Sequence, residues 1–267
     1  MRAVLLTSSM ARHAWVASTL ARELDLVGVW QEEKTFVPER YAVSGDDLAL
    51  IHAHFAARDA AEARDFGGDS IPTLAPGATL RRVGGNGCNA AAEVACMMAL
   101  RPDVGLVFGT GILKDDVIRA FEGRLLNIHL GLSPYYRGAG TNFWPLVNRQ
   151  PEYVGATIHY IDEGIDTGPM VAHVRPEIRP GDGGHDLGNR TIIAATRTLA
   201  RAASLHVAGR LQGVPQAGAG RVYYRKDFNA DSVRRAQDNF RTGMIEEYLA
   251  DRARRDAALS LVALPPA

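Results

Sequence analysis

The stretch VGLVFGTGILKDDVIRAFEGRLLNIHL, residues 104–130, has the pattern of a strand, a helix and a second strand in direct succession. Val104–Leu113 and Arg124–Leu130 are short apolar runs that are typical of buried strands, and Val117–Phe121 between them has the spacing of a short helix. A helical crossover joins parallel strands rather than antiparallel ones. These residues therefore predict a parallel strand–helix–strand unit.

The same alternation extends on both sides of this unit. Strands that alternate with helices form a parallel sheet with helices on both faces, so the fold class is predicted to be α/β with a doubly wound sheet. The connection over residues 67–87 is predicted to be rich in loops. Further strands are predicted at Ala3–Leu6 and Leu26–Trp30, and helices at Ala11–Leu24, Asp46–Phe66, Asn89–Leu100, Asp186–Leu211 and Ala230–Leu259.

A change of pattern after residue 151 predicts a hairpin. VGATIHYI (154–161) and PMVAHVRPEI (169–178) are strand-like, and DEGIDTG (162–168) between them is short and rich in Gly and Asp. Such a short connection joins antiparallel strands, so we expect a mixed, mostly parallel sheet. RVYYRKDF (221–228) is a short polar and aromatic segment.

The composition is that of a globular protein: 46% of the 267 residues are apolar and 22% are charged. Basic and acidic residues number 30 each, so nothing in the net charge favours nucleic acid or an anionic membrane. No apolar run approaches the roughly 20 residues of a spanning helix and no signal peptide is evident, so we expect the cytoplasm. On one helix, Cys88 and Cys96 would lie roughly 12 Å apart, too far to pair.

Two polar residues, Asn127 and His129, lie near the carboxyl end of the last strand in the opening stretch. Because they are two residues apart, their side chains share one face of that strand. Ligands of parallel α/β sheets bind at this end of the strands. A neutral His can exchange a proton near pH 7, and an Asn amide can donate to a developing oxyanion, so the pair suits attack on a carbonyl. The alternative is a buried polar pair that is bonded only to backbone.

Asp166, in the loop of the predicted hairpin, is a candidate partner for this pair. Sequential elements tend to be neighbours in space, so Asp166 could orient His129 or stabilise its charge. The alternative is a turn-forming Asp whose side chain bonds its own backbone. His52 and His54 point to different sides of a helix, and the other histidines lack ligand spacing, so no metal site is predicted.

The motifs NIHLGLSPYYRG (127–138) and DEGIDTG (162–168), together with PDVGLVFGTGIL (102–113), resemble the folate-dependent formyltransferase family. The resemblance covers roughly residues 1–215, taken as a catalytic domain. Residues 216–267 are expected to form a short segment and a helical C-terminal extension. The family resemblance implies a Rossmann-like formyltransferase fold.

The resemblance also implies roles for individual residues. Asn127, His129 and Asp166 would be catalytic, and 10-formyltetrahydrofolate would be the co-substrate, with no metal. The loop Thr7–Arg12 would face the acceptor. Arg137 either binds an acceptor carboxylate or phosphate, or is a surface arginine. The pterin would be held by backbone near Gly111 and Leu113 and by Glu163, Gly164, Ile165 and Asp166; the acceptor contacts would come from Ser8, Ser9, Met10 and Arg137.

The acceptor is expected to be a small amine, such as an amino sugar nucleotide or an amino-acid derivative. The loop TSSMAR (7–12) lacks the Gly-rich phosphate loop of the purine enzymes. The residues after Arg221 are too few for the tRNA-binding barrel of the methionyl-tRNA enzymes. Two alternatives remain: a formyltetrahydrofolate deformylase, which uses water as acceptor, and a non-catalytic module that binds folate or a nucleotide. Whether the terminal helix packs on its own domain or forms a homodimer is open.

GGNGCNA (84–90) matches the letters of a dinucleotide-binding fingerprint, but it follows a loop rather than a first strand. We interpret it as the turn that enters the next helix. Phe143 and Trp144 are interpreted as core residues rather than as a stacking site.

Overall fold

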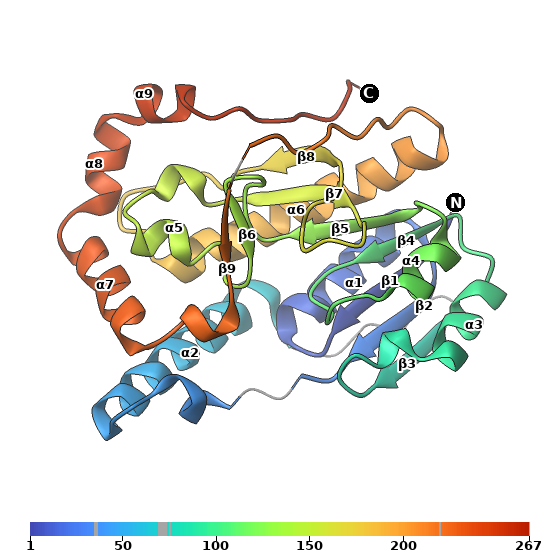
Figure 1. Ribbon diagram of the computed structural model, residues 1–267, viewed down its shortest axis with the longest axis horizontal. Coiled ribbons are helices and arrows are strands. Elements are labelled where there is room, and N and C mark those ends of the chain that lie inside the picture. The colour runs from blue at the N-terminus through green and yellow to red at the C-terminus, as the bar shows by residue number, and fades with distance from the viewer. Residues whose placement is uncertain (35–36, 69–73, 75, 219, 267) are drawn as a thin grey trace.

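The computed structural model describes residues 1–34, 37–68, 74, 76–218 and 220–266. Among these residues, seven strands form one mixed sheet in the order β3-β2-β1-β4-β5-β7-β8 (Figure 1). The first five pair in parallel and the last two join antiparallel, which confirms the predicted sheet type and the hairpin. The strands are β1 Arg2–Ser8, β2 Asp25–Glu32, β3 Thr79–Val83, β4 Val104–Val107, β5 Leu125–His129, β7 Ala156–Tyr160 and β8 Met170–Val174.

Helices cover both faces of this sheet. Alternate residues of β1 enter two different cores: Leu5 packs with α1 and α6 on one face, and Leu6 packs with α3 and α4 on the other. This is the result of the two-residue period of a strand that is buried on both sides. The helices are α1 Ala11–Glu23, α2 Gly45–Phe66, α3 Ala91–Ala99, α4 Asp115–Phe121, α5 Trp144–Val147, α6 Gly184–Val207, α7 Ala230–Arg241, α8 Met244–Ala250 and α9 Arg252–Ala257, with 3₁₀ turns at Pro38–Tyr41, Gly87–Asn89, Pro151–Tyr153 and Arg225–Asp227.

The strand predicted for Val104–Leu113 is too long. β4 ends at Val107, and the chain turns at Gly109, whose φ is +79°. A Cβ at Gly109 would overlap the imidazole of His13, so this turn needs glycine. Residues 108–113 form a loop rather than a strand, and this loop borders the cavity described below.

Two predictions around residues 79–91 are wrong in detail. The loop-rich connection contains β3, an edge strand whose residues are exposed or half-buried and so show no apolar alternation. Asn89 is not the N-cap of the next helix, because α3 begins at Ala91 after Ala90. The Asn89 side chain instead donates to the Ile112 carbonyl (3.0 Å) and accepts from the Lys114 amide (2.8 Å). GGNGCNA does form the turn that enters this helix, with Asn86 in the left-handed region.

The single terminal helix predicted for Ala230–Leu259 is divided into α7, α8 and α9. Gly243, with φ +80°, separates the first two. Before them, β9 (Arg221–Tyr223) pairs in parallel with β6 (Tyr136–Gly138) in a separate two-stranded sheet. Figure 1 shows β9 alongside β6 and the last residues running toward β8. There the amide of His173 donates to the Val262 carbonyl (2.7 Å).

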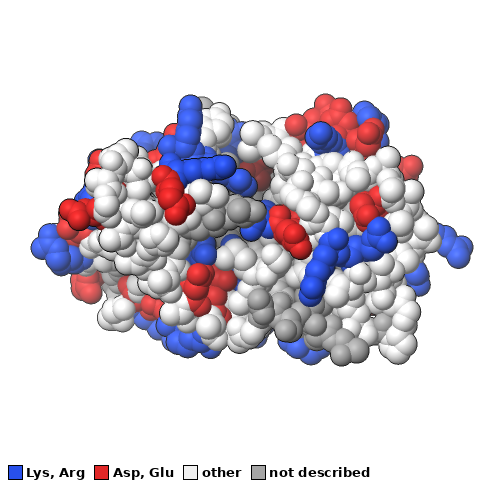
Figure 2. Space-filling view, turned by 90° about the horizontal axis from the view of Figure 1, so that it is seen from below, with Lys and Arg blue, Asp and Glu red and all other residues white. Residues whose placement is uncertain are grey.

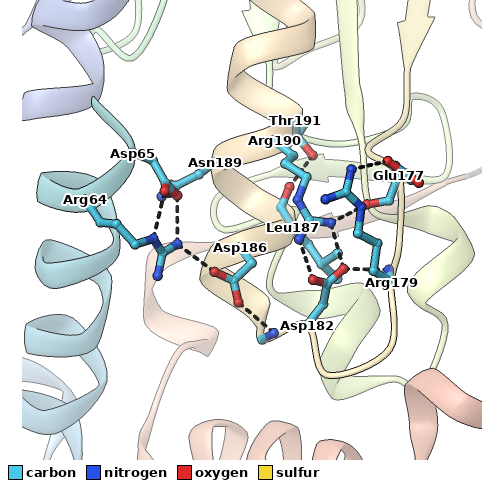
Figure 3. A network of polar contacts seen from close by, with 11 residues as sticks. Arg64, Asp65, Glu177, Arg179, Asp182, Asp186, Leu187, Asn189, Arg190 and Thr191 are labelled. Atoms are coloured by element: carbon cyan, nitrogen blue, oxygen red, sulfur yellow. Dashed lines mark hydrogen bonds and ion pairs between the residues drawn. The ribbon is translucent and has the colours of Figure 1, made fainter. Parts of the chain in front are cut away.

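Polar contacts join the end of α2 to the start of α6 (Figure 3). Arg64 of α2 lies 2.7 Å from the carboxylate of Asp186, and the amide of Asn189 donates to Asp65 at 2.7 Å. One turn further along α6, Arg190 pairs with Asp182. These contacts fix two helices that both line the cavity.

No helix in the described part of the chain is long and apolar enough to cross a membrane. Cys88 is buried and Cys96 is exposed, and both are free, as predicted.

Candidate active site

A cavity of about 1330 Å³ lies at the carboxyl ends of β4 and β5. Asn127 and His129 of β5 both line it, since residues two apart share a face of the strand. Asp166 reaches the same cavity from the loop between β7 and β8. The structure therefore brings together the three residues that the sequence nominated as catalytic.

Both ring nitrogens of His129 face acceptors. Nδ1 lies 3.2 Å from Oδ2 of Asp166, and Nε2 lies 2.9 Å from the carbonyl oxygen of Tyr136. The same Asp166 oxygen accepts from the Gly138 amide at 3.1 Å. An imidazole between a carboxylate and a carbonyl is held in one orientation and is ready to carry a second proton.

His159, which the sequence analysis missed, fixes Asn127. It lies on β7 directly opposite Asn127 in the antiparallel register. Nδ2 of Asn127 lies 3.0 Å from Nε2 of His159, while Nδ1 of His159 lies 2.8 Å from the Tyr160 carbonyl. Since Nδ1 must donate to that carbonyl, Nε2 accepts from the Asn127 amide. The second N–H of this amide remains for a ligand.

Burial and mutual charge set the protonation of this group. Burial by itself would raise the pKa of Asp166, but His129, His159 and the Gly138 amide hold that pKa at about 2. Burial lowers the pKa of His129 below its usual 6.5, and the charge of Asp166 offsets this only in part. Near pH 7 the pair therefore combines an ionised Asp166 with a neutral His129, which can accept a proton.

The residues nominated for the pterin all line this cavity: Gly111, Leu113 and Glu163–Asp166. The amide of Gly111 is already bonded, because it donates to the buried carboxylate of Glu32 at 2.6 Å. Lys34 donates to the carbonyls of Gly109 and Thr110. Glu32 and Lys34, which the sequence analysis did not single out, thus hold the loop 108–113 in place.

The structure does not bring the nominated acceptor residues to the cavity. Ser8, Ser9, Met10 and Arg137 are not among the described residues that line it. The Ser8 hydroxyl is buried and donates to the Glu32 carbonyl at 2.9 Å. The Nε atom of Arg137 is buried without a hydrogen-bond partner.

Segments that are distant in sequence form the side of the cavity away from the loop 108–113. His54 of α2 and His185 of α6 face each other with ring centroids 5.0 Å apart. Phe143 also lines the cavity, and its ring centroid lies 5.6 Å from that of His54. It is therefore a cavity residue as well as a packing residue. The C-terminal part contributes residues 222–225 and, from α7, Gln237 and Phe240. No local pattern in the sequence connects these positions.

Several basic side chains line the cavity. Arg12 pairs with Glu62, and Nε of Arg58 lies 3.8 Å from the same carboxylate. Lys34 and Arg225 also line the cavity, and after burial it is the charge of Arg225 that most lowers the pKa of Lys34. On the face drawn in Figure 2 the surface is hollowed near its middle, and both Lys or Arg and Asp or Glu side chains lie around the hollow.

Residues 81–203 match the family model for formyl transferases, and this match confirms the resemblance inferred from the sequence. The methionyl-tRNA formyltransferase of a Synechococcus species is 30% identical over 149 residues, which is 54% of this chain and 46% of that protein. The trifunctional purine biosynthetic protein adenosine-3 of Drosophila pseudoobscura pseudoobscura is 35% identical over 105 residues, which is 39% of this chain and 8% of that protein. The chain thus spans less than half the length of these curated relatives.

A similar solved structure is that of a sugar N-formyltransferase from a Shewanella species. It aligns with a TM-score of 0.55 at 16% identity, over 88% of this chain and 87% of that one. This likeness shows the formyltransferase fold.

Proposed function

We propose that this chain, whose residues 81–203 match the formyl transferase family, moves a formyl group from 10-formyltetrahydrofolate to the amine of a small acidic acceptor. The observation that supports this most is the convergence of Asn127, His129 and Asp166 in one cavity. Attack of an amine on a formyl carbon requires a hydrogen-bond donor to the formyl oxygen, an acid–base pair and room for two substrates. We place this reaction in cytoplasmic one-carbon metabolism.

The cavity fits a flat, partly apolar co-substrate on the side of the loop 108–113. Ile112 and Ile165 line it with exposed fractions of 72% and 47%, which is unusual for large apolar side chains. Leu113 lies deeper and is buried. 10-Formyltetrahydrofolate would supply the formyl group, with its apolar ring faces against these side chains.

Asn127 acts on the formyl oxygen. As the amine nitrogen bonds to the formyl carbon, this oxygen gains negative charge. The free N–H of the Asn127 amide can donate to it, since His159 occupies only the other N–H. One such donor is worth roughly 3–4 kcal/mol of barrier.

His129 and Asp166 handle the proton. The attacking amine must lose one proton and the leaving nitrogen must gain one. The reaction therefore needs a group that accepts the proton from the amine and passes it to the leaving nitrogen. Both ring nitrogens of His129 already face protein acceptors, so the proton reaches the pair through the carboxylate of Asp166, directly or through a water, and returns to the leaving nitrogen the same way. The imidazolium form of His129 is stabilised by this carboxylate and by the Tyr136 carbonyl. No metal is needed for this step.

The basic groups that line the cavity support an acceptor with a negative charge. Arg12, Lys34, Arg58 and Arg225 line the cavity, and the buried carboxylate of Glu62 is placed to neutralise Arg12 and Arg58. Like charges that gather in a cavity repel one another, and a bound phosphate or carboxylate relieves this. Both expected acceptor classes, amino sugar nucleotides and amino-acid derivatives, carry such a group.

The direct test is the absorbance change as 10-formyltetrahydrofolate becomes tetrahydrofolate, with and without a pool of amines. We expect turnover only with amines, and loss of turnover in His129→Ala. Turnover without any amine would replace the proposal with a deformylase. Tight folate binding without turnover would replace it with a binding module.

The charge of the acceptor has its own test. Arg225→Ala should raise the KM of the acceptor by about 2- to 5-fold, the range for an exposed ion pair, and less at high salt. Lys226→Ala is the matched control, because Lys226 is the next residue but does not line the cavity. Equal effects of the two substitutions would contradict an anion contact at Arg225.

A further inference from the structure

Strand β6 has two edges with different partners. On one edge, the Tyr136 carbonyl accepts from His129 Nε2 at 2.9 Å, and the Gly138 amide donates to Asp166 at 3.1 Å. Both contacts come from even-numbered residues of the strand. One short strand thus contacts both members of the acid–base pair.

The other edge of β6 is paired with β9. The Arg221 amide donates to the Tyr135 carbonyl at 3.0 Å, and the Ala139 amide donates to the Tyr223 carbonyl at 2.7 Å. Odd-numbered residues make these contacts, because neighbouring backbone groups of a strand point to opposite edges. β9 therefore fixes the position of β6, whose backbone in turn bonds His129 and Asp166.

Close packing makes this pairing rigid. The Tyr223 ring stacks on Trp144 with centroids 4.5 Å apart and lies parallel to Tyr136 at 5.8 Å. A Cβ at Gly138 would overlap the Tyr223 carbonyl, and a Cβ at Gly220 would overlap the Pro134 carbonyl. The backbones of these two segments approach so closely that only glycine fits at both points.

We propose that β9 is a positioning element for the reaction: by pairing with β6, it sets where His129 and Asp166 lie relative to each other. This rests on the proposed function for its effect on turnover. β9 lies outside residues 81–203, the part that matches the family model. The C-terminal segment is therefore needed for the chemistry and not only for the shape of the cavity.

Gly220→Ala tests the proposal at a residue that does not itself line the cavity. The added methyl must push β9 away from Pro134 and hence loosen its pairing with β6. We expect kcat at saturating substrates to fall by about 10- to 100-fold, as for misplaced catalytic groups. Gly45→Ala is the control, since a Cβ there meets nothing within 4 Å, the backbone is not left-handed, and the residue does not line the cavity.

A second readout needs no substrate, so it stands even if the proposed reaction is wrong. The pKa of His129 can be followed by NMR in both variants. The groups that face His129 are Asp166 and His159 from the hairpin and Arg137 from β6, together with the Tyr136 carbonyl. Weakening the bond to that carbonyl should lower the pKa of His129 in Gly220→Ala and leave it unchanged in Gly45→Ala.

The outcomes separate the possibilities. A raised acceptor KM with unchanged kcat and unchanged His129 pKa would show that β9 only lines the cavity, and would overturn the proposal. If Gly220→Ala does not fold, Arg221→Pro removes the amide that donates to Tyr135, while Arg221→Ala keeps this amide and controls for loss of the arginine side chain. Equal kcat and equal His129 pKa in this second pair would also overturn the proposal.

Discussion

At the scale of the residue, each polar group of the site is oriented by another. The Asn127 amide is fixed by His159, which is itself fixed by the Tyr160 carbonyl. His129 is fixed by Tyr136 and Asp166. Preorganised donors of this kind lose little free energy to reorganisation during the reaction, which is why they stabilise charge well.

Asn127→Ala should lower kcat by about 100- to 1000-fold, because it removes the donor to the formyl oxygen. The KM of the folate should change little, since the contact strengthens only as charge develops. Steady-state kinetics on folded protein, verified by circular dichroism, gives both values. An unchanged kcat would remove Asn127 from the mechanism.

The pH dependence follows from the coupled pair. Since burial lowers the pKa of His129, the acid limb of kcat/KM should lie below pH 6.5. Asp166, with a pKa of about 2, stays ionised over the measured range and adds no limb. Asp166→Asn removes the charge that raises the pKa of His129, so the limb should move to lower pH. A shift of the acid limb of kcat/KM to higher pH in this variant would contradict the pairing of His129 with Asp166. If the residual activity is too low, NMR titration of His129 measures the same pKa directly.

At the scale of the element, glycines with left-handed backbone place the ends of helices and strands. Gly109 ends β4 and starts the loop over the cavity, and Gly243 separates α7 from α8. The sequence pattern missed both boundaries because the apolar spacing continues through them. A positive φ overrides such a pattern, since other residues reach that region only at a cost.

Gly243→Ala should destabilise the protein by roughly 1–2 kcal/mol, the cost of a left-handed alanine. Gly188→Ala is the opposite case: Gly188 lies inside α6, and an added methyl meets nothing within 4 Å. That substitution should stabilise the protein by roughly 1 kcal/mol, the helix preference of Ala over Gly. Urea unfolding measures both, and effects of the same sign would contradict the assigned backbone conformations.

At the scale of the whole molecule, the C-terminal helices share a core with the rest of the chain. Met244, Ile245 and Tyr248 of α8 are buried against Leu146 and Leu187. α7 contacts both α2 and α5, so these helices pack on their own chain. Residues 216–267 are therefore joined to the catalytic part through packed cores as well as through β9.

A chain that ends at Gly220 should lose cooperative unfolding. It lacks Val233 of α7 and the large buried side chains Met244, Ile245 and Tyr248 of α8, each of which contributes roughly 1.5–3 kcal/mol. Together they approach the 5–15 kcal/mol net stability of a typical protein. A chain that ends at Leu259 removes only the terminal segment and should stay folded. Thermal unfolding compares the two, and a cooperative transition in the shorter chain would refute this view of the core. Light scattering of the full chain tests for a homodimer.

The sequence by itself determined the alternation of strands and helices, the mixed sheet with its hairpin, and the placement of Asn127 and His129 on one face of β5. These features follow from periods of two and 3.6 residues, which are local properties of the chain. The position of Asp166 in the loop of the next hairpin made it a candidate partner, and the family motifs agreed with that choice. The structure places that carboxylate beside His129.

Only the tertiary structure decided which other groups complete the site. His159 meets Asn127 through a strand register, Glu32 reaches Gly111 across 79 residues, and β9 joins β6 across more than 80. Such contacts depend on how whole elements cross and pair. The free energy that selects them comes from packing throughout the core, which no local stretch of residues encodes.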